Sequence, residues 1–269
     1  MKSLSFDAYV LKWIAVIAMI MNHIAIAWHA VLPFPVLLVL FGVGGLTYTI
    51  MAYFVVEGYK YTSNLRKYIT RLLIFGIIAQ AFHPMVLGIT AMIPGMLLNI
   101  MFTITLALIV LLMYDKIKIR ILFWILFVVA CAVAFFMDLF FVGVLVPLLY
   151  YAIKKEGVRR TLPGIIAGLI FLLLGSLNAI SLLILENTPG MEQEALNIIE
   201  SVGMSREIIL AIPTFALGCF AGAILIRNYN DERGKPAKWL FYVAYPLHLA
   251  IIAGIGIALG VTEFSLFGF

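Results

Sequence analysis

Charged residues are scarce in this chain of 269 residues: they make up 12% of it, about half the share found in an average soluble domain. Apolar residues supply 65%, and the mean hydropathy is +1.15. No stretch is long and polar enough to form a separate soluble module. Water cannot be the solvent for most of such a surface. We therefore expect one all-α membrane domain over residues 1–269, in contact with membrane lipids.

Cysteine is scarce as well. The only two, Cys131 and Cys219, each lie within an apolar run. A disulfide framework is thereby excluded, because it would need an oxidant inside the bilayer. A cleavable signal peptide is not expected either. Residues 1–7 are too short and too weakly basic for its first segment, and the apolar run that follows is long enough to remain a helix.

Apolar runs that approach the roughly 17–25 residues needed to cross a membrane recur along the chain. They predict nine transmembrane helices, over residues 11–30, 36–58, 68–87, 95–114, 121–137, 139–153, 162–185, 208–226 and 239–259. Only Asp138 separates the fifth run from the sixth, but one helix over both would be about 50 Å long. A tight hairpin at residues 136–139 fits better. If its arms do not cross fully, they should form a re-entrant hairpin that leaves the remaining topology intact.

The loops between the predicted helices alternate: one is basic, and the next has almost no basic residues. Of the 18 lysines and arginines, Arg206 alone lies on the side opposite the others, in a long acidic loop. The positive-inside rule makes the basic side cytoplasmic, so we predict a cytoplasmic N-terminus and an extracytoplasmic C-terminus. The pI of 9.2 follows largely from this topology, and nucleic acid is not an expected partner. The basic side comprises Lys2, Lys12, Lys60, Arg66, Lys67, Arg71, Lys116, Lys118, Arg120, Lys154, Lys155, Arg159, Arg160, Arg227, Arg233, Lys235 and Lys238.

Ionisable side chains inside a span cost several kcal/mol, so each is a functional candidate. His23 lies near the middle of the first span, eleven residues after Lys12 at its mouth. Eleven residues make about three helical turns, so the two side chains share a face about 16 Å apart. A long ligand with a phosphate head could follow this line. The alternative is a histidine that hydrogen-bonds between helices for packing.

His248 lies near mid-depth in the last span. Tyr245 shares its face, and Pro246 between them frees a backbone carbonyl. Packing around a proline kink is the alternative reading. His83, which precedes Pro84 towards the outer end of the third span, is consistent with a simple end-of-helix signal.

Two carboxyl groups lie at the ends of spans. Glu57 ends the second span, where it could contribute to a cofactor site or pair with Arg66 or Arg71. Asp138 lies in the outer hairpin, where it could contact a cationic acceptor or cap the following helix. His29, next to Trp28, is expected at the membrane interface.

The second loop is short, basic and aromatic. Arg66, Lys67 and Arg71 lie at the start of the third helix, whose first backbone amides also favour anions. Anionic lipid headgroups would satisfy this patch, and a nucleotide-bearing cofactor with several phosphates would fit equally well.

Several of these polar positions belong to segments that look familiar, over residues 11–23, 54–64, 68–72, 99–103, 137–143 and 233–249. The most specific is Tyr245-Pro246-Leu247-His248-Leu249 next to a basic loop. In this order the segments resemble the TraX family, membrane proteins named for the conjugal-transfer protein that acetylates pilin. Where the family often reads Asp-His, this chain reads Asn22-His23. The spacing from Lys12 to His23 is also similar to the basic-x10-His pattern of the acyltransferase-three membrane acetyltransferases.

The resemblance implies an acetyltransferase of the bacterial inner membrane, with acetyl-CoA as the cytoplasmic cosubstrate and no metal. The CoA phosphates would meet the basic mouth, and the thioester would reach His23, the general base. His248 or Tyr245 could polarise the carbonyl or orient His23, while Asp138 would face an acceptor from outside. The residues expected at the mouth are Lys12, Arg66, Arg71, Arg233, Lys235 and Glu57.

The sequence leaves alternatives open for the acceptor and for the function. The acceptor could be a protein N-terminus, a glycan or a lipid headgroup, reached directly or through an acetyl-histidine. A transporter or proton-coupled permease that uses His23 and His248 as relay groups is the second interpretation. No internal repeat supports it. A third is an assembly partner of a secretion system for surface structures.

Overall fold

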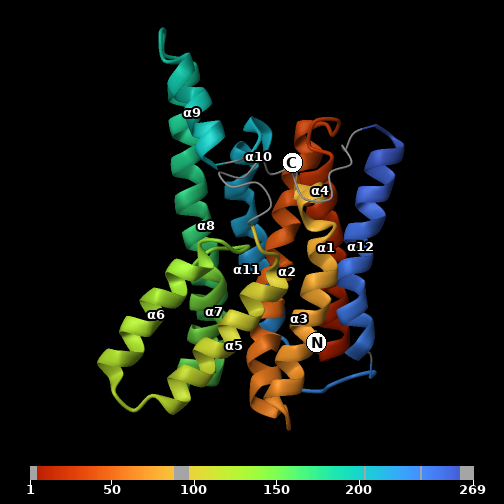
Figure 1. Cartoon of the computed structure of the whole chain (residues 1–269), viewed down its shortest axis with the longest axis vertical. Helices are drawn as coiled ribbons and strands as arrows, with labels where there is room; N and C mark the ends of the chain where they lie inside the picture. The colour runs from red at the N-terminus through yellow and green to blue at the C-terminus, as the bar shows by residue number, and fades with distance from the viewer. Residues whose placement is uncertain (1–4, 88–96, 203, 237, 261–269) are drawn as a thin grey trace.

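The computed structural model is a bundle of α-helices that run mostly up and down one long axis (Figure 1). It describes residues 5–87, 97–202, 204–236 and 238–260, without the side chains of residues 200–202, 238 and 240. The predicted contributions of Lys2 and Lys238, the start of the fourth run and the end of the C-terminal segment therefore lie outside the described residues.

Every predicted apolar run coincides with helix in the described chain. Five helical segments are long and apolar enough to cross a membrane: α1 (Ala8–Ala27), α2 (Phe34–Tyr61), α8 (Glu156–Glu186), the segment Arg206–Arg227 and most of α12 (Lys238–Ala258). The all-α prediction is confirmed, and with it the multi-pass character that five such helices imply. The count of nine crossings stays a prediction.

Prolines divide two of the runs. The third run breaks after α3 (Leu65–Gln80), and α4 (His83–Leu87) follows with Pro84 as its second residue. The eighth is divided into α10 (Arg206–Ala211), a 3-10 turn (Ile212–Thr214) around Pro213, and α11 (Phe215–Arg227). Proline has no backbone N–H to donate and its ring clashes with the preceding turn. A helix therefore tends to break or begin where a proline stands.

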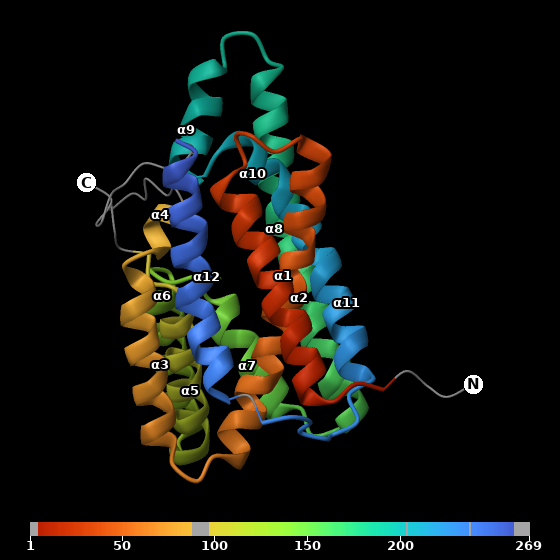
Figure 2. The same cartoon turned by 90° about the vertical axis from the view of Figure 1, so that its right-hand side faces the viewer.

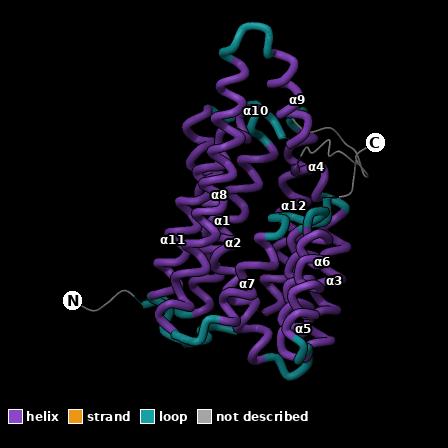
Figure 3. Tube along the Cα trace, turned by 90° about the vertical axis from the view of Figure 1, so that its left-hand side faces the viewer, coloured by secondary structure: helices purple, strands orange, loops and turns teal. Residues whose placement is uncertain are grey.

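The helices α5 (Ile100–Lys116), α6 (Arg120–Ala134) and α7 (Val142–Ala152) lie in the lower part of the bundle in Figure 1. The turn between α6 and α7 lies part-way up, where Figure 3 shows loop backbone away from both ends of the bundle. At about 1.5 Å per residue, α7 is only about 17 Å long. A break near the predicted hairpin is confirmed, and its second arm, α7, is short, whereas the re-entrant alternative stays a prediction.

The loops that carry basic residues, or lie next to them, gather at one end of the bundle, here called the basic end (Figure 2). They are the loops 62–64, 117–119, 153–155 and 228–236. Phe6 pairs with Tyr229 in a short parallel bridge, so the first described residues lie against the loop between α11 and α12. The opposite, acidic end carries α9 (Glu192–Val202), which packs on the end of α8, and Arg206 binds Glu186 there at 2.6 Å. The two cysteines are free, as predicted.

Glycines allow α2 and α11 to pack backbone against backbone. A Cβ added at Gly45 would overlap the carbonyl oxygen of Phe215 and lie 2.6 Å from the amide nitrogen of Cys219. Gly218 meets the backbone of Gly42 just as closely. Small residues at helix crossings are what lets membrane helices approach, since lipid gives no hydrophobic drive for their association.

Replacing Gly45 by alanine is therefore expected to destabilise the protein by about 1–3 kcal/mol, because the backbone of α11 must move away. The measurement is the thermal midpoint of the purified protein in detergent. Gly254→Ala is the matched control, since Gly254 is also helical but has nothing within 4 Å of an added Cβ. Equal midpoints for the two variants would contradict the close packing.

Candidate functional site

Two histidines predicted near mid-depth meet between α1 and α12. Nε2 of His248 lies 3.2 Å from Nδ1 of His23, and the ring centroids are 4.8 Å apart. His248 is buried and His23 is half-buried. Residues 225 positions apart in the chain thus form one pair, which agrees with the prediction that both belong to one centre.

The backbone determines which ring nitrogens carry protons. Nδ1 of His23 lies 2.8 Å from the carbonyl of Met19, and Nδ1 of His248 lies 2.8 Å from that of Ala244. A carbonyl only accepts, so each Nδ1 carries a hydrogen. Nε2 of His248 then accepts from Nδ1–H of His23. Nε2 of His23 keeps its lone pair, and no side chain in the described part of the chain hydrogen-bonds to it.

Tyr245 lies beside this pair. Its ring centroid is 6.3 Å from that of His23 and 5.5 Å from that of His248. Its side chain is 2% exposed, and its hydroxyl makes no hydrogen bond of good geometry within the described residues. The hydroxyl lies near the backbone of Ile100 and interacts electrostatically with the carboxylate of Asp138. A donor in this position could serve an oxygen that enters the site.

Asp138 and His83 complete what we call the histidine site: His23, His83, Asp138, Tyr245 and His248. Nε2 of His83 lies 3.0 Å from Oδ2 of Asp138, and His83 is also close enough to His23 to interact electrostatically. Asp138 is delivered by the turn between α6 and α7, His83 by α4. The sequence offered an end-of-helix signal as one reading of His83 and gave no partner for it, so its contact with Asp138 was missed.

Of the residues predicted at the basic mouth, the structure brings some together. Lys12 is half-buried, 4.7 Å from the Phe54 ring and 5.9 Å from the Phe241 ring. Arg233, exposed in the loop before α12, is near enough to Lys12 to repel it electrostatically. Two like charges that lie close together favour an anion between them.

The other predicted mouth residues are more scattered. Arg71 places its guanidinium 5.7 Å from the Tyr242 ring of α12, and no hydrogen-bond partner in the described chain reaches its buried Nε. Arg66 and Lys235 are exposed at the same end. The mouth predicted from the sequence is thus a basic rim around the ends of α1, α3 and α12 that lie at the basic end.

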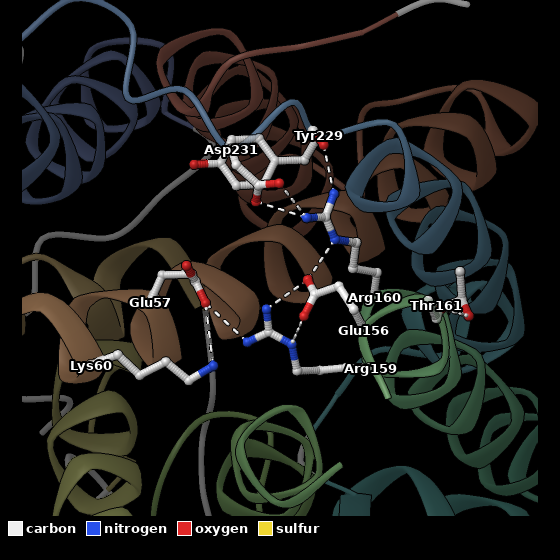
Figure 4. Close-up of polar contacts among 9 residues, drawn as sticks. Glu57, Lys60, Glu156, Arg159, Arg160, Thr161, Tyr229 and Asp231 are labelled. Atoms are coloured by element: carbon white, nitrogen blue, oxygen red, sulfur yellow. Dashed lines mark hydrogen bonds and ion pairs between the residues drawn. The ribbon is translucent and has the colours of Figure 1, made fainter. Parts of the chain in front are cut away.

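Glu57 belongs to a different structure. It binds Arg159 of α8 at 3.0 Å and Lys60 at 3.5 Å, so the predicted pairing with Arg66 or Arg71 is wrong. Figure 4 shows the cluster that results, here called the ion-pair cluster: Glu57, Lys60, Glu156, Arg159, Arg160 and Asp231.

The ion-pair cluster ties the loop before α12 to the bundle. Arg160 donates to both carboxylate oxygens of Asp231, at 2.7 and 2.6 Å, and to the carbonyl of Tyr229 at 2.6 Å (Figure 4). Its guanidinium also lies 5.7 Å from the Tyr229 ring. Burial raises the pKa of the Tyr229 phenol to about 12, so this ring enters the cluster uncharged. The sequence around Arg159 and Arg160 did not predict these partners.

Two asparagine side chains link neighbouring segments of the bundle. Nδ2 of Asn22 donates to the carbonyl of Phe41 at 3.4 Å and so links α1 with α2. Nδ2 of Asn99 donates to Gly76 and to Gln80, both at 2.8 Å. Nδ1 of His29 bonds the carbonyl of Ile26 in its own turn at 2.9 Å, its one hydrogen bond to the described residues. In the described chain no group of three or more His, Cys, Asp or Glu could hold a metal ion.

Comparison with known protein families decides the relationship. Residues 7–256 match the family described as TraX protein.

The chain belongs to the TraX family. The match begins at the N-cap of α1 and ends near the end of α12, so all five residues of the histidine site lie inside the TraX region. The resemblance stated from the sequence is confirmed.

A curated relative covers the same length. The probable fimbrial assembly protein FimC, serogroup H1, of Dichelobacter nodosus is 25% identical over 272 residues, which span 93% of this chain and 96% of that protein. No solved structure matches.

Proposed function

We propose that this TraX protein is a membrane acetyltransferase that moves an acetyl group from acetyl-CoA to an amine or hydroxyl of an acceptor. The observation that carries the proposal is the free lone pair on Nε2 of His23, oriented by Met19 and by His248. A base with one free nitrogen and a second nitrogen held by hydrogen bonds is the arrangement that general-base catalysis requires.

The reaction follows from these positions. The acceptor nitrogen or oxygen attacks the thioester carbon and gives its proton to Nε2 of His23. The new C–N or C–O bond forms and the C–S bond breaks. The CoA thiolate then takes the proton from Nε2 of His23 and leaves as the thiol, which returns His23 to its neutral form. Nδ1–H of His23 stays shared between Met19 and His248, which stabilises the imidazolium while it exists. Tyr245 would donate its hydroxyl proton to the oxyanion.

We place the basic end in the cytoplasm of a bacterium, with nine crossings of the inner membrane. CoA is strongly anionic and cytoplasmic, so the positive-inside topology brings the basic rim and the cosubstrate to the same side. Lys12, Arg71 and Arg233 would bind its phosphates, with Arg66 and Lys235 at the periphery. Lys12 and His23 share a face of α1, which directs the pantetheine arm towards the histidine site.

The acceptor would arrive at Asp138 from the acidic end. The family is associated with acetylation of pilin at its N-terminus, and the curated relative is named for fimbrial assembly. Both support an acceptor among the subunits of a surface fibre. An amine acceptor would be an ammonium ion in water, and the Asp138 carboxylate is suited to bind it. This ion would give one proton to water before its nitrogen, as the neutral amine, attacks the thioester.

The test is acetyl transfer by purified protein supplied with labelled acetyl-CoA. Two probe peptides of one shape are offered: tetra-alanine amide with a free amino group, and its analogue with lactic acid as first residue, which presents a hydroxyl. We expect labelled peptide from at least one of them, or slow release of labelled acetate. CoA should also raise the thermal midpoint, because a ligand that binds only the native state stabilises it.

Absence of transfer, of hydrolysis and of a thermal shift would overturn the proposal. Flux of a solute across proteoliposomes without dependence on CoA would instead favour the permease reading.

A further inference from the structure

Asp138 is held from several directions by the chain around it. Its amide donates to the carbonyl of Leu98 at 2.9 Å, and its carbonyl accepts from the hydroxyl of Thr103 at 3.0 Å. Its Oδ2 meets Nε2 of His83 at 3.0 Å. Three partners from three other segments therefore determine where this one residue lies.

The backbone directly after Asp138 is strained. Leu139 has φ 65° and Phe140 has φ 48°, both in the left-handed region that bulky residues avoid. Such conformations persist only where the surroundings enforce them, and they cluster at functional sites. Gly143, on the next turn, leaves room for the methyl group of Thr103, which a Cβ at this position would strike. The turn is thus built around a fixed position of Asp138.

The support extends to α3. Gln80 donates to the carbonyl of Leu97 at 2.9 Å and accepts from the amide of Asn99 at 3.0 Å. These bonds hold residues 97–99, and Leu98 in turn pairs with Met137 in a short parallel bridge. Gln80 is a polar residue inside the third apolar run, so the sequence marks it as unusual. Only the fold shows that it binds residues 97–99.

His83 is the one side chain that bonds the carboxylate itself within the described chain. It is 1% exposed, whereas the Asp138 side chain is 19% exposed. With Nε2–H of His83 on Oδ2, the other oxygen, Oδ1, has no hydrogen bond from the described residues. The bonded oxygen faces the buried imidazole, and the free one remains for a ligand.

We infer that His83 is a positioning residue of the acetyl transfer: it holds the Asp138 carboxylate so that Oδ1 receives the acceptor beside Nε2 of His23. This inference rests on the proposed function. α4, which carries His83, packs against both α1 and α12, and its Val86 lies in one hydrophobic cluster with Tyr245. The His83–Asp138 and His23–His248 pairs therefore belong to one site. Without His83 the carboxylate would turn away or take up a proton, and the acceptor would lose its partner.

The experiment compares His83→Leu with His83→Gln in the labelled acetyl-CoA assay with the tetra-alanine amide peptide. Glutamine keeps an N–H donor about where Nε2 stood, and leucine removes it. We expect His83→Leu to lower kcat/KM for the peptide by roughly tenfold to a hundredfold, the effect of one hydrogen bond to a charged group. KM for acetyl-CoA should change by less than about twofold, and His83→Gln should recover most of the loss.

Controls separate positioning from folding. His29→Leu removes a histidine whose one side-chain hydrogen bond among the described residues goes to the backbone of Ile26, and it should behave as wild type. The thermal shift caused by CoA should persist in His83→Leu. In an Asp138→Asn background, His83→Leu should have little further effect, because two residues that act as one unit are not additive.

Wild-type kinetics of His83→Leu, in a preparation where His23→Ala is inactive, would overturn the inference and leave the proposed function intact. A loss in His83→Leu that His83→Gln does not restore, together with loss of the CoA shift, would assign His83 to folding instead. An inactive wild-type protein would overturn the proposed function and with it this inference.

Discussion

His23→Ala is expected to lower acetyl transfer by about 10²–10⁴-fold, the usual contribution of a positioned general base. Alanine removes the only nitrogen of the His23–His248 pair whose lone pair is free, since Nε2 of His248 already accepts from His23. Binding of CoA at the basic rim should be little affected. The measurement is the rate of labelled peptide formation, together with the thermal shift caused by CoA.

Two further variants show whether the loss belongs to the base itself. His248→Ala removes a residue that orients His23 and shares its Nδ1–H with Met19 but does not take the acceptor's proton, so its effect should be smaller, about tenfold. His29→Ala should leave the rate unchanged, because the hydrogen bond that its ring makes to the described residues goes to the backbone of its own turn, at Ile26. Normal turnover by His23→Ala would remove this residue from the mechanism. Label retained on acid-quenched wild-type protein but absent from His23→Ala would indicate an acetyl-histidine intermediate.

The helices, and the alignment of Lys12 with His23, could be predicted from the sequence because both depend on local pattern. Apolar runs mark helices whatever they pack against, and Lys12 and His23 share a face simply because both are on α1. The divisions at Pro84 and Pro213 are also local, and the runs that contain these prolines were read as single helices only because apolar character continues through them.

Contacts between distant segments are what the sequence alone could not supply. His83 and Asp138 are separated by 55 positions, and Glu57 and Arg159 by 102. Hydropathy shows that each lies near the end of a run, but not which runs are neighbours. The wrong partner predicted for Glu57 follows from this: Arg66 and Arg71 are near in sequence, whereas α8 is near in space.

Arg159→Leu is expected to destabilise the protein by about 3–5 kcal/mol, the cost of leaving one partner of a buried ion pair alone. The side chains of Arg159 and Glu57 are 10% and 15% exposed. Lys60 is farther from Glu57, at 3.5 Å, and more exposed, so it replaces little of the lost contact. The measurement is the thermal midpoint in detergent. Lys155→Leu removes a charge from the same end but has an exposed side chain with no ion pair in the described chain, and it should be close to wild type.

The double variant Glu57→Gln, Arg159→Leu separates a stabilising role of Glu57 from a role in binding acetyl-CoA. If Glu57 serves only to hold Arg159, the double variant should be more stable than Arg159→Leu, because no carboxylate is left unpaired. KM for acetyl-CoA would then be unchanged in Glu57→Gln. If KM rises in Glu57→Gln while the thermal midpoint stays near that of wild type, the carboxylate contributes to the cosubstrate site, as its position in the sequence predicted.

The ion-pair cluster anchors Asp231, two residues before Arg233. A rise in KM for acetyl-CoA that is confined to Arg159→Leu would therefore mean that the cluster acts through the loop that carries Arg233.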